Sequence, residues 1–211
     1  MLNKTRIAVL VSGGGTNLQA LIDAEKAGKL GGGEITLVIS SKPEVYALER
    51  ARVNYIPAKV VSRKEYPDIK SYTAALSKEL LEADIDLVVL AGFLTIIDEQ
   101  LYNSFKNRII NVHPALIPSF CGKGFYGLRV HEAALQKGVK LSGATVHIVT
   151  PEFDAGPIIQ QNAVEVRDDD TPETLQKRIM EEAEWKILPE AVRLFCDDKI
   201  EIKDNKVHIK N

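Results

Sequence analysis

The feature that most constrains the fold is an alternation of short apolar runs with segments of helical periodicity. Residues 7–11 are apolar throughout, which suits a strand that is buried on both faces. Residues 16–27 follow, with Leu18, Leu21 and Ile22 on one helical stripe. A chain that repeats this alternation is expected to form an α/β fold around an open, mostly parallel sheet.

The same pattern continues through the first half of the chain. Strands are predicted over residues 35–39, 56–61, 86–91 and 108–112, and helices over residues 45–53 and 69–81. In the second half, residues 144–149 alternate between the two faces of a strand, and residues 158–166 contain strand formers. These two segments predict mixed or antiparallel strands in the C-terminal half of the sheet.

The C-terminal region carries clear start and stop signals. A threonine, a proline and a glutamate at residues 171–173 predict the start of a helix that continues to residue 195. We expect a bend or break in that helix near Pro189, because proline cannot complete the helical hydrogen-bond ladder. Residues 200–209 predict a hairpin that turns at residues 204–205.

Composition and charge exclude several classes of protein. The 27 basic and 29 acidic residues give a net charge of −2, which argues against a dedicated nucleic-acid binder. No apolar run is long enough for a transmembrane helix, and the N-terminus does not resemble a signal peptide. Only two cysteines occur, which disfavours a disulfide scaffold, so we expect a cytoplasmic protein that acts away from membranes.

A glycine-rich turn lies between the first predicted strand and the first predicted helix. The run SGGGTN at residues 12–17 occupies the place where an open α/β sheet binds an anion, because glycines allow close approach and helix N–H groups point at the ligand. Thr16 and Asn17 add side-chain donors. The run matches neither the dinucleotide fingerprint nor the phosphate loop of nucleotidases, so a single phosphate is the expected ligand. A tight turn with no ligand is the alternative.

Asn111 and His113 stand at the carboxyl end of a predicted buried strand. They are two residues apart, so both side chains point to the same side of the sheet. A histidine can accept or donate a proton near neutral pH, and an asparagine amide can stabilise an oxyanion. The residue pair therefore predicts acid–base chemistry, although a single histidine is more often structural.

Asp154 lies in a loop between two predicted strands, at residues 151–157. A carboxylate beside a histidine would raise the pKa of the ring and orient it, but an Asp before a glycine is also a common turn. His131 and His147 are interpreted as surface histidines or as satisfied core histidines. Histidine and cysteine spacing matches no metal motif, so no metal is expected.

Taken together, these segments resemble the phosphoribosylglycinamide formyltransferase family, also called glycinamide ribonucleotide transformylases. The matching segments occur in family order at residues 8–20, 48–51, 89–93, 111–118, 143–147, 153–159 and 184–189. The Asn-x-His-Pro and Asp-x-Gly motifs are shared with the wider formyltransferase superfamily. The SGGGTN loop is more specific to this branch.

The resemblance implies a Rossmann-like formyltransferase fold and a reaction. The amine of glycinamide ribonucleotide would attack the formyl carbon of 10-formyltetrahydrofolate, as a step of purine synthesis, without a metal. His113 would be the general acid and base, Asn111 would hold the oxyanion, and Asp154 would hold His113 in its proton-transfer state. The three positions match the family motifs residue by residue.

The resemblance also implies where the two substrates bind. The ribonucleotide would contact Gly15, Thr16, Asn17 and Glu184. The folate would contact Arg63, Leu94, Thr95, Ile96, Ile97, Asn111, Thr150, Pro151, Glu152, Phe153 and Asp154. The partners are thus small molecules, and the chain is expected to be a monomer or a homodimer.

On this basis the 211 residues are expected to form one catalytic domain. Residues 1–105 would be its phosphate-binding half, residues 106–195 its catalytic and folate-binding half, and residues 196–211 the hairpin. The loop at residues 120–129 is longer than in many members. We expect it to be either a mobile lid over the folate or an ordered insertion.

Two departures from the family pattern and two alternative functions are open at this point. The family often has Met-Arg where Leu94 and Thr95 stand, and a neutral or basic residue where Glu181 stands, which puts contacts at these positions in doubt. A formyltetrahydrofolate deformylase or another formyltransferase is the nearest alternative function. A phosphate-binding module without catalysis is the most distant one.

Overall fold

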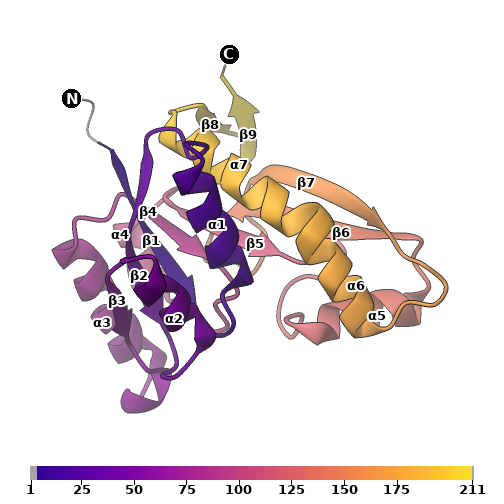
Figure 1. Ribbon diagram of the computed structural model, residues 1–211, viewed down its shortest axis with the longest axis horizontal. Coiled ribbons are helices and arrows are strands. Elements are labelled where there is room, and N and C mark those ends of the chain that lie inside the picture. Colours follow the sequence, from indigo (N-terminus) through magenta and orange to yellow (C-terminus); the bar gives the residue numbers. More distant parts are fainter. Residues whose placement is uncertain (1–3, 211) are drawn as a thin grey trace.

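The computed structural model describes residues 4–210 and contains a seven-stranded sheet (Figure 1). Its strands are β1 (Thr5–Val11), β2 (Gly33–Ser40), β3 (Ala58–Val60), β4 (Leu87–Leu90), β5 (Ile109–His113), β6 (Leu141–Ile148) and β7 (Ile158–Glu165). Their order across the sheet is β3-β2-β1-β4-β5-β6-β7. Strands β1 to β5 pair in parallel, whereas β6 and β7 pair antiparallel. The prediction of a mostly parallel sheet with mixed strands in its C-terminal half is confirmed.

Helices cover both faces of the sheet. They are α1 (Thr16–Lys26), α2 (Tyr46–Val53), the 3₁₀ turn η1 (Arg63–Glu65), α3 (Ile69–Glu82), α4 (Glu99–Ser104), α5 (Leu128–Lys137), α6 (Pro172–Ile179), the π turn η2 (Met180–Glu184) and α7 (Trp185–Cys196). In β1, Ile7, Val9 and Val11 pack in the core cluster that includes α1 and α7. Ala8 and Leu10 pack in the cluster that includes α3 and α4. This strand is buried on both faces, which explains its unbroken apolar run.

The strand order creates a crevice at one edge of the sheet. β1 and β4 are neighbours although β2 and β3 lie between them in the sequence. From β1 the chain continues to β2 and β3 on one side of the sheet, and then returns to β4 on the other side of β1. The loops that follow β1 and β4 therefore turn away from each other. Residues 12–15 follow β1, residues 91–98 follow β4, and β5 ends beside β4 at His113. Ligands of open α/β sheets bind at such a point.

The neighbouring strand fixes the chain directly after β5. Thr145 on β6 is paired with His113 across the sheet. Its hydroxyl donates a hydrogen bond to the Ala115 carbonyl oxygen at 2.7 Å and accepts one from the Ile117 N–H at 3.0 Å. This buried hydroxyl therefore sets the direction in which the chain leaves the sheet after His113.

Of the bend or break expected near Pro189, a break is wrong. Pro189 lies inside α7, and the irregular segment is the π turn from Met180 to Glu184. The hydrogen bond that Pro189 cannot donate would have gone to Trp185, where the π turn meets α7, so the ladder is already irregular there. The π turn also points Glu184 toward α1, where Asn17 donates a hydrogen bond to its carboxyl group at 2.5 Å.

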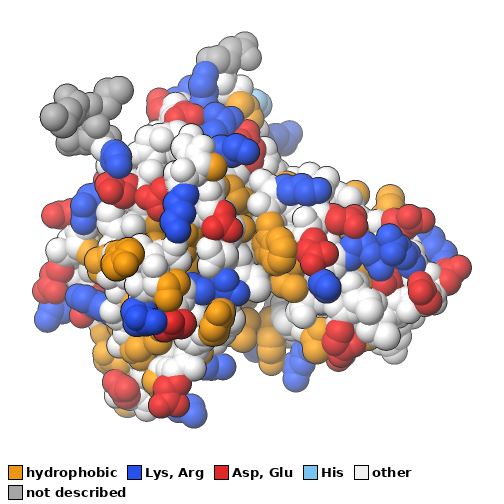
Figure 2. All heavy atoms as spheres, viewed as in Figure 1, with side chains coloured by type: hydrophobic (Ala, Val, Ile, Leu, Met, Phe, Trp, Pro, Cys, Tyr) orange, Lys and Arg blue, Asp and Glu red, His pale blue; other side chains and the backbone are white. Residues whose placement is uncertain are grey.

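The C-terminal hairpin is confirmed as β8 (Ile200–Lys203) and β9 (Lys206–Ile209). Both turn residues, Asp204 and Asn205, have positive φ values of 47° and 57°, as a two-residue hairpin turn requires. On the face shown in Figure 2, acidic and basic side chains are interspersed. Over residues 4–210, every helix is too short or too polar to cross a membrane.

Candidate functional site

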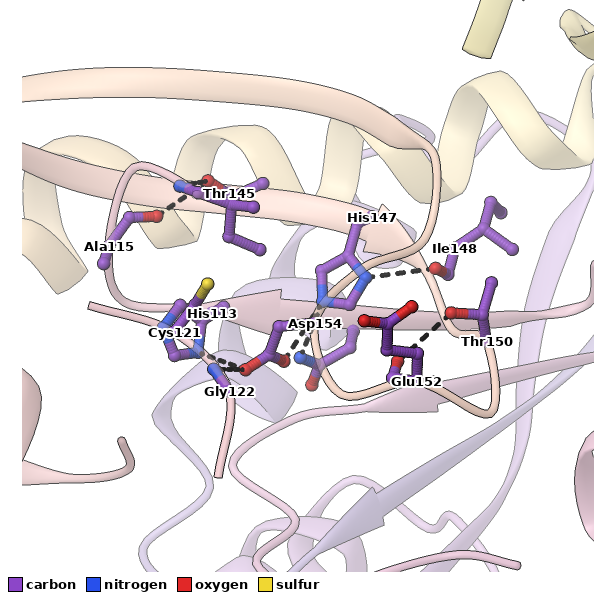
Figure 3. A network of polar contacts seen from close by, with 12 residues as sticks. His113, Ala115, Cys121, Gly122, Thr145, His147, Ile148, Thr150, Glu152 and Asp154 are labelled. Atoms are coloured by element: carbon purple, nitrogen blue, oxygen red, sulfur yellow. Dashed lines mark hydrogen bonds and ion pairs between the residues drawn. The ribbon is translucent and has the colours of Figure 1, made fainter. Parts of the chain in front are cut away.

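Asp154 lies between two histidine rings at the carboxyl end of β5 (Figure 3). One carboxylate oxygen, Oδ2, is 3.8 Å from His113 Nδ1, and the other, Oδ1, is 3.6 Å from His147 Nε2. Oδ2 also accepts a hydrogen bond from the Gly122 N–H at 2.8 Å. The structure thus brings together the two residues, His113 and Asp154, whose contact the spacing alone could not predict.

The tautomer of His113 follows from its second nitrogen. Nε2 lies 2.8 Å from the carbonyl oxygen of Phe120, and a carbonyl can only accept. Nε2 therefore carries the proton and donates it. In the neutral ring, Nδ1 then holds a lone pair on the side of Asp154. Nδ1 is therefore the ring atom that can accept a proton, and the Asp154 carboxylate lies 3.8 Å from it.

Burial and neighbouring charges act on both members of this pair. Burial is the largest influence on His113 and lowers the pKa of its ring, although Asp154 and the Phe120 carbonyl raise it. Burial raises the pKa of Asp154, but contacts with His147, the Gly122 N–H and His113 together outweigh burial and hold that pKa below its usual value. At neutral pH the pair is therefore a carboxylate beside a neutral imidazole.

His147 orients Asn111. Its Nδ1 lies 3.0 Å from the Ile148 carbonyl oxygen, so Nδ1 is the protonated nitrogen of the neutral ring. Nε2 then accepts a hydrogen bond from Asn111 Nδ2 at 3.1 Å. The second N–H of the Asn111 amide has no hydrogen-bond partner among the described residues. One ring thus contacts both Asn111 and Asp154.

His147 is the satisfied core histidine that the sequence indicated, but its contact with Asn111 was not predicted. The signal that could have found it is its strand partner, because His147 on β6 lies directly opposite Asn111 on β5. The interpretation of His131 as a surface or satisfied core histidine is wrong. Its ring is fully buried on α5, and neither nitrogen has a hydrogen-bond partner among the described residues. Burial lowers its pKa to about 4, so the ring is neutral.

The glycine-rich loop and Glu184 are brought together as the resemblance implied. Gly13 and Gly14 are exposed, and Asn17 at the start of α1 donates to the Glu184 carboxyl group. Burial raises the pKa of Glu184 to about 7, and the hydrogen bond from Asn17 only partly offsets this. Thr16 contacts Met180 of the same π turn at 3.6 Å. The loop, α1 and the π turn therefore form one end of the crevice.

Most residues implied for the folate lie on two loops, whereas Arg63 lies on η1 and Asn111 on β5. Leu94 and Ile96 are exposed apolar side chains of the loop after β4, and Phe153 is exposed next to Asp154. The Leu94 N–H donates to Ser12 Oγ at 3.0 Å, which ties this loop to the glycine-rich loop. Of the remaining implied residues, Ile97 packs against the core, Thr150 donates to the Glu152 carbonyl oxygen, and Pro151 and Glu152 are exposed.

Arg63 and Thr95 lie around one buried side chain, Tyr72 of α3. Burial raises the pKa of the Tyr72 hydroxyl to about 12, whereas Thr95 and the charge of Arg63 oppose that rise. Arg63 itself donates to the Tyr66 carbonyl oxygen at 2.7 Å. The 3₁₀ turn η1 thus stands next to the loop after β4.

Comparison with known proteins identifies relatives over nearly the whole chain. A family model described as formyl transferase matches residues 5–192. The chloroplastic phosphoribosylglycinamide formyltransferase of Arabidopsis thaliana is 38% identical over 205 residues, which are 97% of this chain and 70% of that protein. The trifunctional purine biosynthetic protein adenosine-3 of Homo sapiens is 40% identical over 202 residues, which are 96% of this chain but only 19% of that protein.

A solved structure supports the same relationship. The crystal structure of glycinamide ribonucleotide transformylase 1 from Symbiobacterium toebii matches with a TM-score of 0.94 and 41% sequence identity. The match covers 100% of this chain and 96% of that chain.

The negative charge of Asp154 is expected to raise the pKa of the His113 ring. Replacing Asp154→Asn removes a carboxylate that raises the pKa of the ring, so the pKa of His113 should fall below its wild-type value. Nitrogen chemical shifts of the histidine rings, followed by NMR from pH 4 to pH 8, measure this directly. His208 on the exposed hairpin serves as the internal control. A His113 midpoint equal to or above that of the wild type would contradict the arrangement.

The buried Glu184 is expected to make stability depend on pH. Its pKa is about 7 in the folded protein against an ordinary 4.5, so the neutral form stabilises the fold below pH 4.5, and this contribution is lost as pH rises through 7. Relative to Glu184→Gln, the wild type should lose about 2–3 kcal/mol of unfolding free energy between pH 5 and pH 8. Urea denaturation at both pH values tests this. Glu181→Gln, on the exposed side of the same turn, is the control, and parallel profiles for Glu184→Gln and the wild type would refute the effect.

Proposed function

The chain belongs to the formyl transferase family, and on that premise we propose that it transfers the formyl group of 10-formyltetrahydrofolate to the amine of 5-phosphoribosylglycinamide. Relatives that match nearly the whole chain carry the names phosphoribosylglycinamide formyltransferase and glycinamide ribonucleotide transformylase. The observation that carries the proposal is the convergence of Asn111, His113 and Asp154 at the carboxyl edge of the sheet, where the glycine-rich loop also lies.

The reaction requires one proton to move from the attacking to the leaving nitrogen. The amine of the ribonucleotide forms a bond to the formyl carbon, and the formyl oxygen becomes an oxyanion. The bond from that carbon to N10 of the folate then breaks. The amine loses one proton and N10 gains one, so no proton is consumed overall. A single base that becomes the acid of the second step satisfies this balance.

His113 is suited to both steps. Its Nε2–H is held by the Phe120 carbonyl, which leaves the Nδ1 lone pair to accept the proton of the amine. Asp154 is ionised and 3.8 Å from Nδ1, so it would stabilise the imidazolium that forms once this nitrogen is protonated. The lowered pKa of His113 keeps the ring neutral, and thus ready as a base, at neutral pH.

Asn111 would stabilise the oxyanion. Because one N–H of its amide is bound to His147, the other is held in a fixed direction and needs no reorganisation when charge develops. Removing one such donor typically lowers kcat about 100- to 1000-fold. The amide and the imidazole of His113 lie on the same side of β5, as a base and an oxyanion donor for one carbon should.

The substrates would lie at the two ends of the crevice. The phosphate of the ribonucleotide would bind the loop at Gly15, Thr16 and Asn17, and Glu184 would accept from the ribose hydroxyls. A flat pterin ring needs an apolar slot with backbone donors and acceptors. The exposed side chains of Leu94 and Ile96, together with the loop of residues 150–154, suit that requirement.

The function is tested by a spectrophotometric assay of the purified protein with 10-formyltetrahydrofolate. We expect folate release that depends on glycinamide ribonucleotide and is lost in His113→Ala, with unchanged thermal unfolding. Release without the ribonucleotide would identify a deformylase instead. Absence of release under both conditions would leave only a phosphate-binding role.

His147 is expected to act through Asn111 and not through substrate binding. His147→Phe retains a flat buried ring but removes the acceptor of the Asn111 N–H, so kcat should fall about tenfold or more, with the KM for the ribonucleotide unchanged. Steady-state kinetics separate the two constants. His208→Phe on the exposed hairpin is the control. An unchanged kcat, or an effect confined to KM, would exclude this role.

A further inference from the structure

Helix α2 binds the carbonyl groups of the glycine-rich loop, although it lies outside the strand–loop–helix unit that contains that loop. The N–H of Ala47 donates to the Gly13 carbonyl oxygen at 3.2 Å. The next carbonyl, that of Gly14, accepts from Arg50 Nε at 2.8 Å. Two consecutive peptide groups of the loop are therefore held by one turn of α2.

Arg50 is held from three sides. Besides the Gly14 carbonyl, its guanidinium donates through Nη1 to Gln19 Oε1 on α1 at 2.9 Å. The same group lies over the ring of Tyr46, 4.8 Å from its centre. These contacts join the loop, α1 and α2, and they hold a positive charge beside the loop.

Fixing these carbonyls also fixes the direction of the N–H groups. In a planar trans peptide, the carbonyl and the following N–H point in opposite directions. The bond from Ala47 thus turns the N–H of Gly14 away from α2, and the bond from Arg50 turns the N–H of Gly15 away from it. Neither N–H donates a hydrogen bond to any described residue. Both are free for an acceptor on the open side of the loop.

The loop and α2 are packed too closely to move independently. Gly15 has a φ of 72°, and a Cβ atom there would lie 2.7 Å from the Cβ and 2.9 Å from the Cα of Ala47. Real side chains do not approach so closely, so only glycine fits. Helix α2 is therefore the rigid support against which the anion-binding face of the loop is formed.

We propose that Arg50 is a positioning residue for the phosphate end of the ribonucleotide: it binds the Gly14 carbonyl and thereby directs the Gly15 N–H toward the phosphate. Arg50 also polarises that peptide group, because its hydrogen bond carries a full positive charge. The inference rests on the proposed function, since the phosphate belongs to the proposed substrate. Arg50 would thus contribute to specificity for a phosphorylated substrate without contacting that substrate.

The test compares Arg50→Met with Arg50→Lys and with a control, Arg52→Met. Arg52 lies on the same helix and is exposed, and among the described residues its guanidinium hydrogen-bonds to Glu49. Calorimetry measures the Kd of each protein for the ribonucleotide and for its dephosphorylated riboside, without folate. Kinetics give kcat and the KM for 10-formyltetrahydrofolate, and thermal unfolding monitors the fold.

In Arg50→Met, the Kd for the ribonucleotide should rise about tenfold or more, with little change in the Kd for the riboside, in kcat or in the KM for the folate. Arg50→Lys should be intermediate, and Arg52→Met should match the wild type. An unchanged ribonucleotide Kd in Arg50→Met, or an equal loss for the riboside, would overturn the assignment.

The proposed function and the role of Arg50 fail in different ways. A wild-type protein that binds the ribonucleotide but transfers no formyl group would refute the proposed function, while the paired Kd values would still decide the role of Arg50. If the wild type transfers the formyl group but wild type and Arg50→Met have the same Kd for the ribonucleotide, only the role of Arg50 is refuted. A wild-type protein that does not bind the ribonucleotide would refute both.

Discussion

The site depends on keeping the carboxylate of Asp154 ionised inside the protein. Its side chain is only 16% exposed, and burial alone would favour the protonated form. The Gly122 N–H donates a hydrogen bond to the carboxylate, and the charged forms of the two neighbouring histidines stabilise it further. These partners come from β5, β6 and the loop after β5. The need to stabilise the buried, ionised Asp154 therefore constrains how β5, β6 and the loop after β5 pack around it.

The loop after β5 contacts both members of the acid–base pair. Phe120 has a φ of 49°, a left-handed conformation that costs a bulky residue on the order of 1 kcal/mol or more. In this conformation its carbonyl accepts from His113, and two residues later the Gly122 N–H donates to Asp154. Displacement of the loop would remove both bonds together. It would raise the pKa of Asp154, and His113 would no longer be held in a single tautomer. The position of this loop and the protonation of His113 and Asp154 are therefore coupled.

Local sequence signals predicted the parts of the site that lie on single elements. The buried strand β5 with its Asn111 and His113 pair was evident from its apolar run and its period of two, and so was the glycine-rich turn after β1. The partnership of Asn111 with His147 was not, because it depends on the antiparallel register of β5 and β6. The π turn at Met180 was missed for a related reason. It is accompanied by a contact with Asn17 more than 150 residues away in the chain, which no local periodicity reports.

The crevice holds two largely buried carboxyl groups whose surroundings shift their pKa values in opposite directions. Asp154 has hydrogen-bond donors and imidazoles around it and is ionised, whereas burial is the dominant influence on Glu184, with a single amide as its partner, and raises its pKa to about 7. A divergence of this kind marks two different tasks. An ionised group suits the stabilisation of an imidazolium. A carboxyl group that loses its charge easily suits a place near a phosphate, because a second fixed negative charge would repel the ligand that the glycine-rich loop is built to bind. The same fold thus gives two carboxyl groups different charge states by burial and hydrogen bonding alone.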